Sequence, residues 1–221
     1  CAGSNPKDKI RVGFVVNDDF DVWLGGINYF KTLIDAIVEL PESMIEPVIF
    51  TGRCNARRVG ELFPNVEVIA SAFMDPWTPG WILRNFFKRI FFKDFLLGRF
   101  FLKHRIGVLS HAGLAVSHSG LPTLCWIPDF QHRHLPQFFS PDEIARRDRR
   151  FSQLCKMSDG VIVSSLNAQK DLMDFCPQGA EKSFVLNFVP KPGERFEHIA
   201  LEELQEKYQV IHPYFHLPNQ F

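Results

Sequence analysis

The chain has 221 residues, 46% of them hydrophobic and 14% aromatic, which supplies a globular core and excludes a disordered chain. Basic and acidic residues number 25 each, so the overall charge does not favour nucleic acid as a partner. The five cysteines form no CxxC pair, which argues against a disulfide scaffold and against a structural zinc site. The sequence also has no apolar run long enough to cross a bilayer. Together these features indicate a cytoplasmic protein.

The chain opens with a loose polar stretch, residues 1–9, which we expect to be a disordered or engineered leader. Residues 10–16 (IRVGFVV) then have the continuous apolar pattern of a strand buried on both faces of a parallel sheet. Gly25 and Gly26 follow, before a segment with helical apolar spacing. Paired glycines let a phosphate or sugar approach a helix N-terminus, although such a pair is more often only turn geometry. The dinucleotide fingerprint GxGxxG is absent, so NAD is not predicted.

Strands and helices continue to alternate along the chain. This alternation predicts an α/β fold, a Rossmann-like, doubly wound, mostly parallel sheet of about seven strands with helices on both faces. After the first strand, we predict strands at 47–52, 66–70, 107–110, 123–127, 160–165 and 183–189.

Residues 81–106 form a long segment that is apolar almost all round. One interpretation is a long core helix followed by a second buried helix, with a break at Gly98. The other is an interfacial helix that faces a membrane, because aromatic and basic side chains mix on one side. The expected core face carries Ile82, Phe86, Ile90, Leu97 and Phe101, and the expected membrane face carries Lys88, Phe92, Phe95, Leu96, Arg99 and Lys103.

A polar loop follows the strand at 123–127, at the sheet edge where ligands bind in open α/β folds. Leu135, Phe138 and Phe139 are expected to anchor this loop on the domain. Its polar residues are Asp129, Gln131, His132, Arg133 and His134. One alternative is a solvated loop. Another is a metal-dependent hydrolase that uses Asp129, His132 and His134 as ligands.

Two neighbouring segments also carry chemistry-bearing side chains. A lone histidine in the Gly-, Ser- and His-rich loop at 111–120 is expected to be structural. A helix is predicted from Ser140, with that serine as its N-cap. Its arginines are expected to form a solvated face, or to meet an anionic acceptor; they are Arg146, Arg147, Arg149 and Arg150.

Four pieces of the sequence resemble one enzyme family. They are IRVGFVV with GGINYF, the loop IPDFQHRHLPQFFS, VIVSS followed by NAQKDL, and the closing PYFHLPNQF. Together they resemble the acceptor-side, N-terminal half of family-4 (group 1) glycosyltransferases of the GT-B fold, over residues 9–221. The resemblance implies a Rossmann-like N-terminal domain at 10–205. Residues 206–221 would then begin a linker and the first strand of a C-terminal donor-binding domain.

The resemblance also implies a function in polysaccharide biosynthesis. The chain would belong to a hexosyl- or deoxyhexosyltransferase and be inactive without its second domain, which binds most of the nucleotide-sugar donor. Gly25, Gly26 and Asn28 would line the cleft near the donor phosphates, and Asp129 and His132 would be catalytic. Gln131, Arg133 and His134 would contact a glycan or lipid-linked glycan acceptor.

No tightly bound cofactor, metal or nucleic acid is implied, and the location would be the cytoplasm or the inner face of a membrane. A non-catalytic binding module that keeps the fold remains an alternative.

Overall fold

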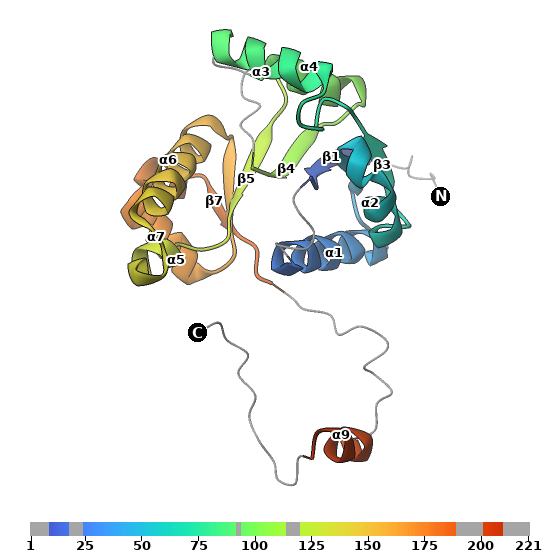
Figure 1. The fold of residues 1–221 in the computed structure, drawn as a ribbon, viewed down its shortest axis with the longest axis vertical. Coiled ribbons are helices and arrows are strands. Elements are labelled where there is room, and N and C mark those ends of the chain that lie inside the picture. Colours follow the sequence, from blue (N-terminus) through green and yellow to red (C-terminus); the bar gives the residue numbers. More distant parts are fainter. Residues whose placement is uncertain (1–8, 18–23, 92–93, 114–119, 189–200, 210–221) are drawn as a thin grey trace, which may run out of the picture. The chain divides into compact units, whose positions relative to one another are not determined.

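The computed structural model describes residues 9–17, 24–91, 94–113, 120–188 and 201–209 (Figure 1). Seven parallel strands form one sheet, in the order β3-β2-β1-β4-β5-β6-β7. The strands are β1 (Ile10–Val15), β2 (Ile45–Thr51), β3 (Glu67–Ala70), β4 (Val108–Ala112), β5 (Thr123–Ile127), β6 (Gly160–Val163) and β7 (Ser183–Val185). The predicted doubly wound sheet of about seven strands is therefore confirmed.

Helices connect the strands and cover both faces of the sheet. They are α1 (Leu24–Glu39), α2 (Ala56–Leu62), α3 (Pro79–Phe91), α4 (Phe95–Lys103), α5 (Gln131–His134), α6 (Pro141–Met157), α7 (Leu166–Phe175) and α8 (Pro177–Ala180). A further helix, α9 (Leu201–Tyr208), belongs to a separate unit of the chain. The strand order places β1 beside β4, and the chain winds outward from this pair in both directions. This pair is therefore the topological switch point of the sheet, beside which ligands bind in open α/β folds.

Alternating side chains of β2 divide the core between the two faces of the sheet. Ile49 packs in one cluster with Phe14 of β1, Ile34 of α1 and Val59 of α2. Phe50 packs on the opposite face, in a cluster with helix α4. The strands at the centre are thus buried on both sides, which explains their nearly continuous apolar sequence.

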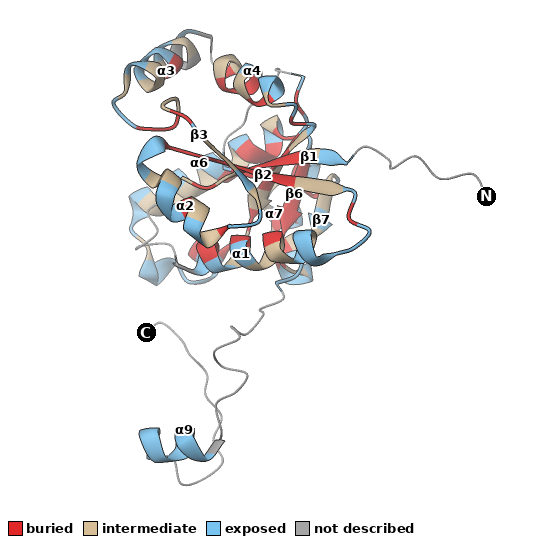
Figure 2. Ribbon diagram, turned by 90° about the vertical axis from the view of Figure 1, so that its right-hand side faces the viewer, coloured by how far each residue is buried: buried red, intermediate tan, exposed pale blue. Residues whose placement is uncertain are grey.

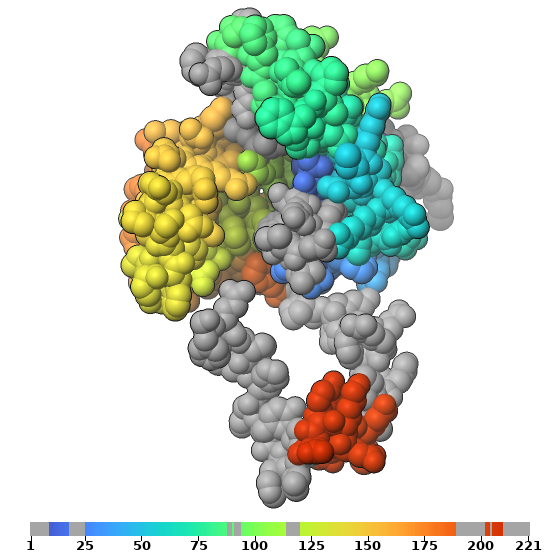
Figure 3. Space-filling view, viewed as in Figure 1, coloured from blue at the N-terminus to red at the C-terminus, as the bar shows by residue number. Residues whose placement is uncertain are grey.

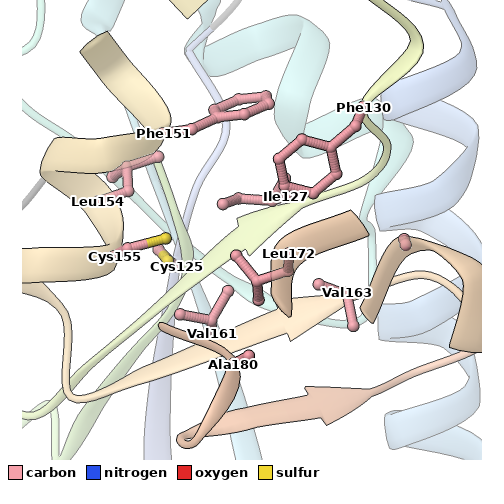
Figure 4. Close-up of a cluster of buried hydrophobic side chains, with 11 residues drawn as sticks. Cys125, Ile127, Phe130, Phe151, Leu154, Cys155, Val161, Val163, Leu172 and Ala180 are labelled. Atoms are coloured by element: carbon pink, nitrogen blue, oxygen red, sulfur yellow. The ribbon is translucent and has the colours of Figure 1, made fainter. Parts of the chain in front are cut away.

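A third cluster joins helices α6, α7 and α8 to β5 and β6 (Figure 4). The side chains of Ile127 and Val163 point from the sheet toward Phe151, Leu154 and the other buried residues of these helices. Helix α6 begins at the predicted N-cap. Ser140 accepts from the N–H of Glu143, whose carboxylate accepts from the N–H of Ser140, completing a capping box.

The segment at 81–106 differs from its prediction. Helix α3 ends at Phe91 and α4 begins at Phe95, where the side chain of Asp94 caps α4 by accepting from the N–H of Leu97. Gly98 lies inside α4 and not at a break. Leu97 and Phe101 are buried as expected, but Ile82, Phe86 and Ile90 are exposed. The core-face prediction is wrong for these three residues because the two helices are separate and do not share one continuous face.

The chain divides into two compact units, residues 1–189 and 190–221. The first unit ends before the expected boundary at 205, and α9 belongs to the second. The expected leader lies almost entirely outside the described residues. Of the expected linker and final strand at 206–221, the structure describes only residues 206–209, and the first three of these belong to α9. Among the described residues, no helix is long and apolar enough to cross a membrane.

Candidate functional site

The carboxyl end of β4, at the switch point, carries a histidine in an unusual backbone conformation. His111 has a φ of 53°, in the left-handed region that side chains other than glycine rarely adopt. The register between β4 and β5 also shifts between Leu109 and Ala112. Strain of this kind persists where the surrounding structure enforces it, and it often marks functional sites.

A chain of hydrogen bonds runs through the His111 ring. Its Nε2 lies 2.7 Å from the hydroxyl of Tyr29 in α1, and its Nδ1 lies 2.9 Å from the hydroxyl of Ser110. A neutral imidazole has one donor and one acceptor nitrogen, and a hydroxyl can serve either. The three groups therefore satisfy one another without carrying charge.

Burial keeps this chain of hydrogen bonds neutral. Desolvation lowers the pKa of His111 to about 3 and raises the pKa of Tyr29 to about 12. Neither group changes charge between pH 5 and pH 9. His111 is buried and both of its ring nitrogens are engaged, so the part-buried hydroxyl of Tyr29 is the group in this arrangement that can hold a neutral ligand group, such as a hydroxyl. The arrangement is unsuited to pairing with an anion.

Aromatic rings surround this chain of hydrogen bonds. Tyr29 stacks on Trp126 of β5, with ring centroids 4.5 Å apart and planes 15° apart. Phe188 meets the edge of this stack 4.8 Å from Tyr29, and its own side chain is exposed. Trp126 also donates to the hydroxyl of Ser164, 3.2 Å away. Partly exposed aromatic faces beside polar groups offer stacking and hydrogen bonding to a ring-shaped ligand.

The glycine pair lies inside α1, not in the loop before it, because the helix begins at Leu24. Gly25 is exposed, and a Cβ added there would meet no atom within 4 Å. Gly26 is buried and Asn28 is exposed. The open space at Gly25 leaves the first turn of α1 accessible to a ligand.

An arginine of α6 also reaches this edge of the sheet. This residue is Arg150. Its Nη2 lies 2.7 Å from the position that a Cβ on Gly113 would occupy, just beyond the end of β4. Arg150 is exposed and brings a positive charge to the end of the same strand that carries His111.

The predicted loop residues follow β5 on the same carboxyl edge, but their side chains do not converge on one point. Asp129 is exposed and its Oδ1 accepts from the N–H of Gln131, 3.0 Å away. Arg133 lies over the ring of Phe175, 5.1 Å from its centroid. Gln131 is exposed, and His134 lies 2.9 Å from Asp171 of α7.

His132 is directed into the interior, not into the site. Its side chain is 0% exposed, and its Nε2 lies 3.0 Å from Oδ1 of Asp148 in α6. Its ring lies among those of Phe130, Phe139 and Phe151. A ring enclosed in this way holds the loop to α6, so Asp129 is the exposed member of the predicted catalytic pair and the catalytic role of His132 stays a prediction.

The hydrolase alternative loses its basis for the same reason. Asp129, His132 and His134 engage a backbone N–H, Asp148 and Asp171 respectively, so the three do not converge on one point. Among the described residues no group of three potential ligands is placed to hold a metal ion.

The expected membrane-facing residues are only partly described. Phe92 lies outside the described residues, and only the backbone of Lys88 is described. Phe95 is half-buried, with its ring 5.9 Å from that of Phe87, whereas Arg99 and Lys103 are exposed on α4.

Sequence reasoning did not single out Tyr29, His111 or Trp126. The composition of the loop at 111–120 predicts a structural histidine, although His111 follows an apolar strand just as Asp129 does. The carboxyl-edge rule that pointed to the loop after β5 applied equally to this position. Tyr29 has no comparable sequence signal, because only the packing of α1 beside β4 and β5 brings it to His111.

No protein-family model matches the sequence, and no curated protein is significantly similar to it. Among solved structures, S. aureus MnaA with UDP aligns with a TM-score of 0.45 and 13% identity, over 80% of this chain and 43% of that one. Glycyrrhiza uralensis UGT73P12, complexed with glycyrrhetinic acid 3-O-monoglucuronide, aligns with a TM-score of 0.45 and 11% identity, over 81% of this chain and 49% of that one. The chain spans less than half of either protein, and likenesses this distant assign no family or activity.

Proposed function

We propose that this chain forms one half of a glycosyltransferase active site, the half that receives the acceptor. The observation that carries the proposal is the neutral chain Ser110–His111–Tyr29 at the switch point, beside the Tyr29–Trp126 stack. The sequence resemblance to family-4 glycosyltransferases supports the same function. The donor would be a nucleotide-sugar held mainly by a second domain, and the acceptor a glycan or lipid-linked glycan.

The arrangement fits sugar recognition. A sugar ring presents an apolar face and several neutral hydroxyls, which match the aromatic stack and the uncharged Tyr29 hydroxyl that His111 holds in place. A leaving diphosphate carries negative charge, which Arg150 and the N-terminal turn of α1 at Gly25 would stabilise. Asp129 is exposed on the same edge and remains our candidate for the base that accepts the proton of the acceptor hydroxyl.

Transfer needs donor and acceptor fixed in one geometry, which is worth up to roughly 7 to 11 kcal/mol of the barrier. We therefore expect this chain alone to bind ligands weakly and to transfer sugar at no useful rate. Turnover comparable to that of a two-domain enzyme would contradict the half-site proposal. A non-catalytic module would bind the same ligands, but joining it to a donor-binding domain would produce no transfer.

Ligand-observed NMR with a panel of nucleotide-sugars and oligosaccharides tests binding. We expect signals that weaken in Gly25→Val, because a branched side chain closes the open approach to α1. The matched control is Gly60→Val in α2, another helical glycine whose Cβ would meet no atom within 4 Å. Equal signals from both variants would show that ligands do not use the first turn of α1.

His111→Phe tests the other side of the site. It keeps an aromatic ring but removes both ring nitrogens, so we expect binding of the oligosaccharide to fall at least ten-fold while the fold is retained, as checked by circular dichroism. Unchanged oligosaccharide binding would show that the hydrogen bond from His111 to Tyr29 does not position the tyrosine for a ligand.

A further inference from the structure

Helix α3 turns an apolar stripe toward solvent. The stripe consists of Ile82, Leu83, Phe86 and Ile90, each between 50% and 57% exposed. At 3.6 residues per turn these four positions fall within about 100° of the helix circumference. Trp77, just before the helix, is 81% exposed. Figure 2 shows α3 at the periphery of its unit, coloured mainly intermediate and exposed.

A buried ion pair fixes this orientation. Arg84 lies outside the stripe and is buried, with its Nε 3.1 Å from Oδ2 of Asp94, the cap of α4. Its Nη1 also donates to the carbonyl oxygen of Phe73, 2.6 Å away. Rolling the stripe inward would expose Arg84 and break its ion pair with the buried Asp94, at considerable cost. The outward stripe is therefore a fixed feature of the fold.

The same region has a strong local excess of positive charge. Residues 76–107 contain seven lysines and arginines but one acidic residue, Asp94, in a chain whose overall charge is zero. Arg84 and Asp94 are buried against each other, so neither contributes to the surface charge, and six basic residues remain in this stretch. Arg99, Lys103 and Arg105 are exposed on α4 and just after it. In the space-filling view, α3 and α4 together form one end of the first unit (Figure 3).

We propose that the outer surface of α3 and α4 docks on an anionic lipid bilayer. The apolar stripe would enter the boundary between headgroups and acyl chains, and the exposed cations of α4 would contact the headgroups. Trp77 would lie at the interface, where tryptophan is enriched. This surface differs from the expected one at Phe92 and Phe95, and the proposal does not depend on whether the chain transfers sugar.

Charge favours a bilayer over a second copy of this chain. In a symmetric dimer the same patch meets itself, so the exposed cations near the stripe would face the cations of the partner. Like charges brought together at an interface oppose association. An anionic bilayer supplies the complementary charge and the apolar layer together.

Vesicle flotation tests the proposal with the full chain. We expect binding to vesicles of phosphatidylcholine mixed with phosphatidylserine, weakening as salt rises, and little binding to phosphatidylcholine alone. The double variant Phe86→Glu/Ile90→Glu should lose binding at least ten-fold. Met173→Glu in α7 is the matched control, since Met173 is an exposed apolar residue outside the patch, and it should bind like the wild type.

A second pair of variants tests the charge. Arg99→Gln/Lys103→Gln should weaken binding about 25-fold, from about five-fold for each cation near the surface. Arg57→Gln/Lys170→Gln removes two exposed cations elsewhere and should bind normally. The fluorescence of Trp77, identified by comparison with Trp77→Phe, should shift to the blue on binding.

Three results would overturn the proposal. The first is equal binding to neutral and anionic vesicles. The second is vesicle binding by the Phe86→Glu/Ile90→Glu variant when that variant is correctly folded. The third is a wild-type dimer, detected by light scattering, that the Phe86→Glu substitution dissociates. The last would show that the stripe is an interface between copies of the chain.

Discussion

The hydroxyl of Tyr29 lies 2.7 Å from Nε2 of His111, although 82 positions separate the two residues in the chain. Helix α1 supplies the tyrosine and β4 the histidine, so the pair exists only because these elements lie side by side at the switch point. The pair therefore reports on both the fold and the candidate site, and its ionisation is a direct test of the site as described.

The buried His111 should make folding stability depend on pH. Its pKa is about 3 in the folded chain, against about 6.5 for a histidine exposed on unfolding. The stabilising effect of keeping it neutral is fully present above pH 6.5 and is lost as pH falls toward 3. Urea unfolding should show a loss of about 2 kcal/mol between pH 6.5 and pH 5 that His111→Gln lacks.

His134→Gln is the control for this measurement, because His134 is exposed. It should keep the pH dependence of the wild type. If His111→Gln retains the same pH dependence as the wild type, the imidazole is not held neutral in the folded chain.

Replacing His132 should affect stability more than replacing His134. His132 fills a space among three phenylalanine rings and contacts Asp148, whereas His134 is exposed beside Asp171. We expect His132→Ala to lower the free energy of unfolding by about 2 to 4 kcal/mol, from lost packing and a lost hydrogen bond. His134→Ala should cost under about 1 kcal/mol. Similar losses in urea unfolding would contradict the structural role given to His132.

The sequence was sufficient to predict the sheet, because each strand is a short apolar run bounded by turn residues and seven such runs alternate with helical patterns. It predicted the N-cap at Ser140 for a similar reason, since local side-chain chemistry fixes a helix start. Side-chain direction was harder to predict. His132 turned inward because Phe130, Phe139 and Phe151 surround it, and no local pattern records that packing.

The α3 stripe was mispredicted for a related reason. Ile82, Phe86 and Ile90 have the spacing of a core face, and periodicity alone does not say which side of a helix meets the protein. The orientation depends on the distant pairing of Arg84 with Asp94, which becomes visible only once the second helix is known to begin after Asp94.

Two glycines should respond oppositely to alanine. A Cβ on Gly52 would collide with the carboxylate of Asp75, which accepts from the N–H groups of Arg53 and Cys54. Gly52→Ala should therefore cost about 2 kcal/mol by disrupting these hydrogen bonds. Gly60→Ala, in open space within α2, should gain up to about 1 kcal/mol from helix propensity. The melting temperatures of the two variants, measured by thermal unfolding, test this ranking. A Gly52→Ala variant as stable as Gly60→Ala, or more stable, would contradict the tight packing described around Gly52.

The thiols should differ in reactivity by burial. Cys155 belongs to α6 and is buried in the hydrophobic cluster between this helix and the sheet. Desolvation, together with the neighbouring Cys176 and Cys125, raises its pKa to about 12. Cys54 is exposed. Since the thiolate is the reactive form, iodoacetamide at pH 8 should label Cys155 about a thousand-fold more slowly than an ordinary thiol, before its lack of access is considered. Peptide mapping by mass spectrometry should find Cys54 modified long before Cys155.

In urea the two thiols should label at similar rates, and this serves as the control for intrinsic reactivity. Equal labelling rates in the folded chain would mean that the cluster between α6 and the sheet opens far more readily than its packing indicates.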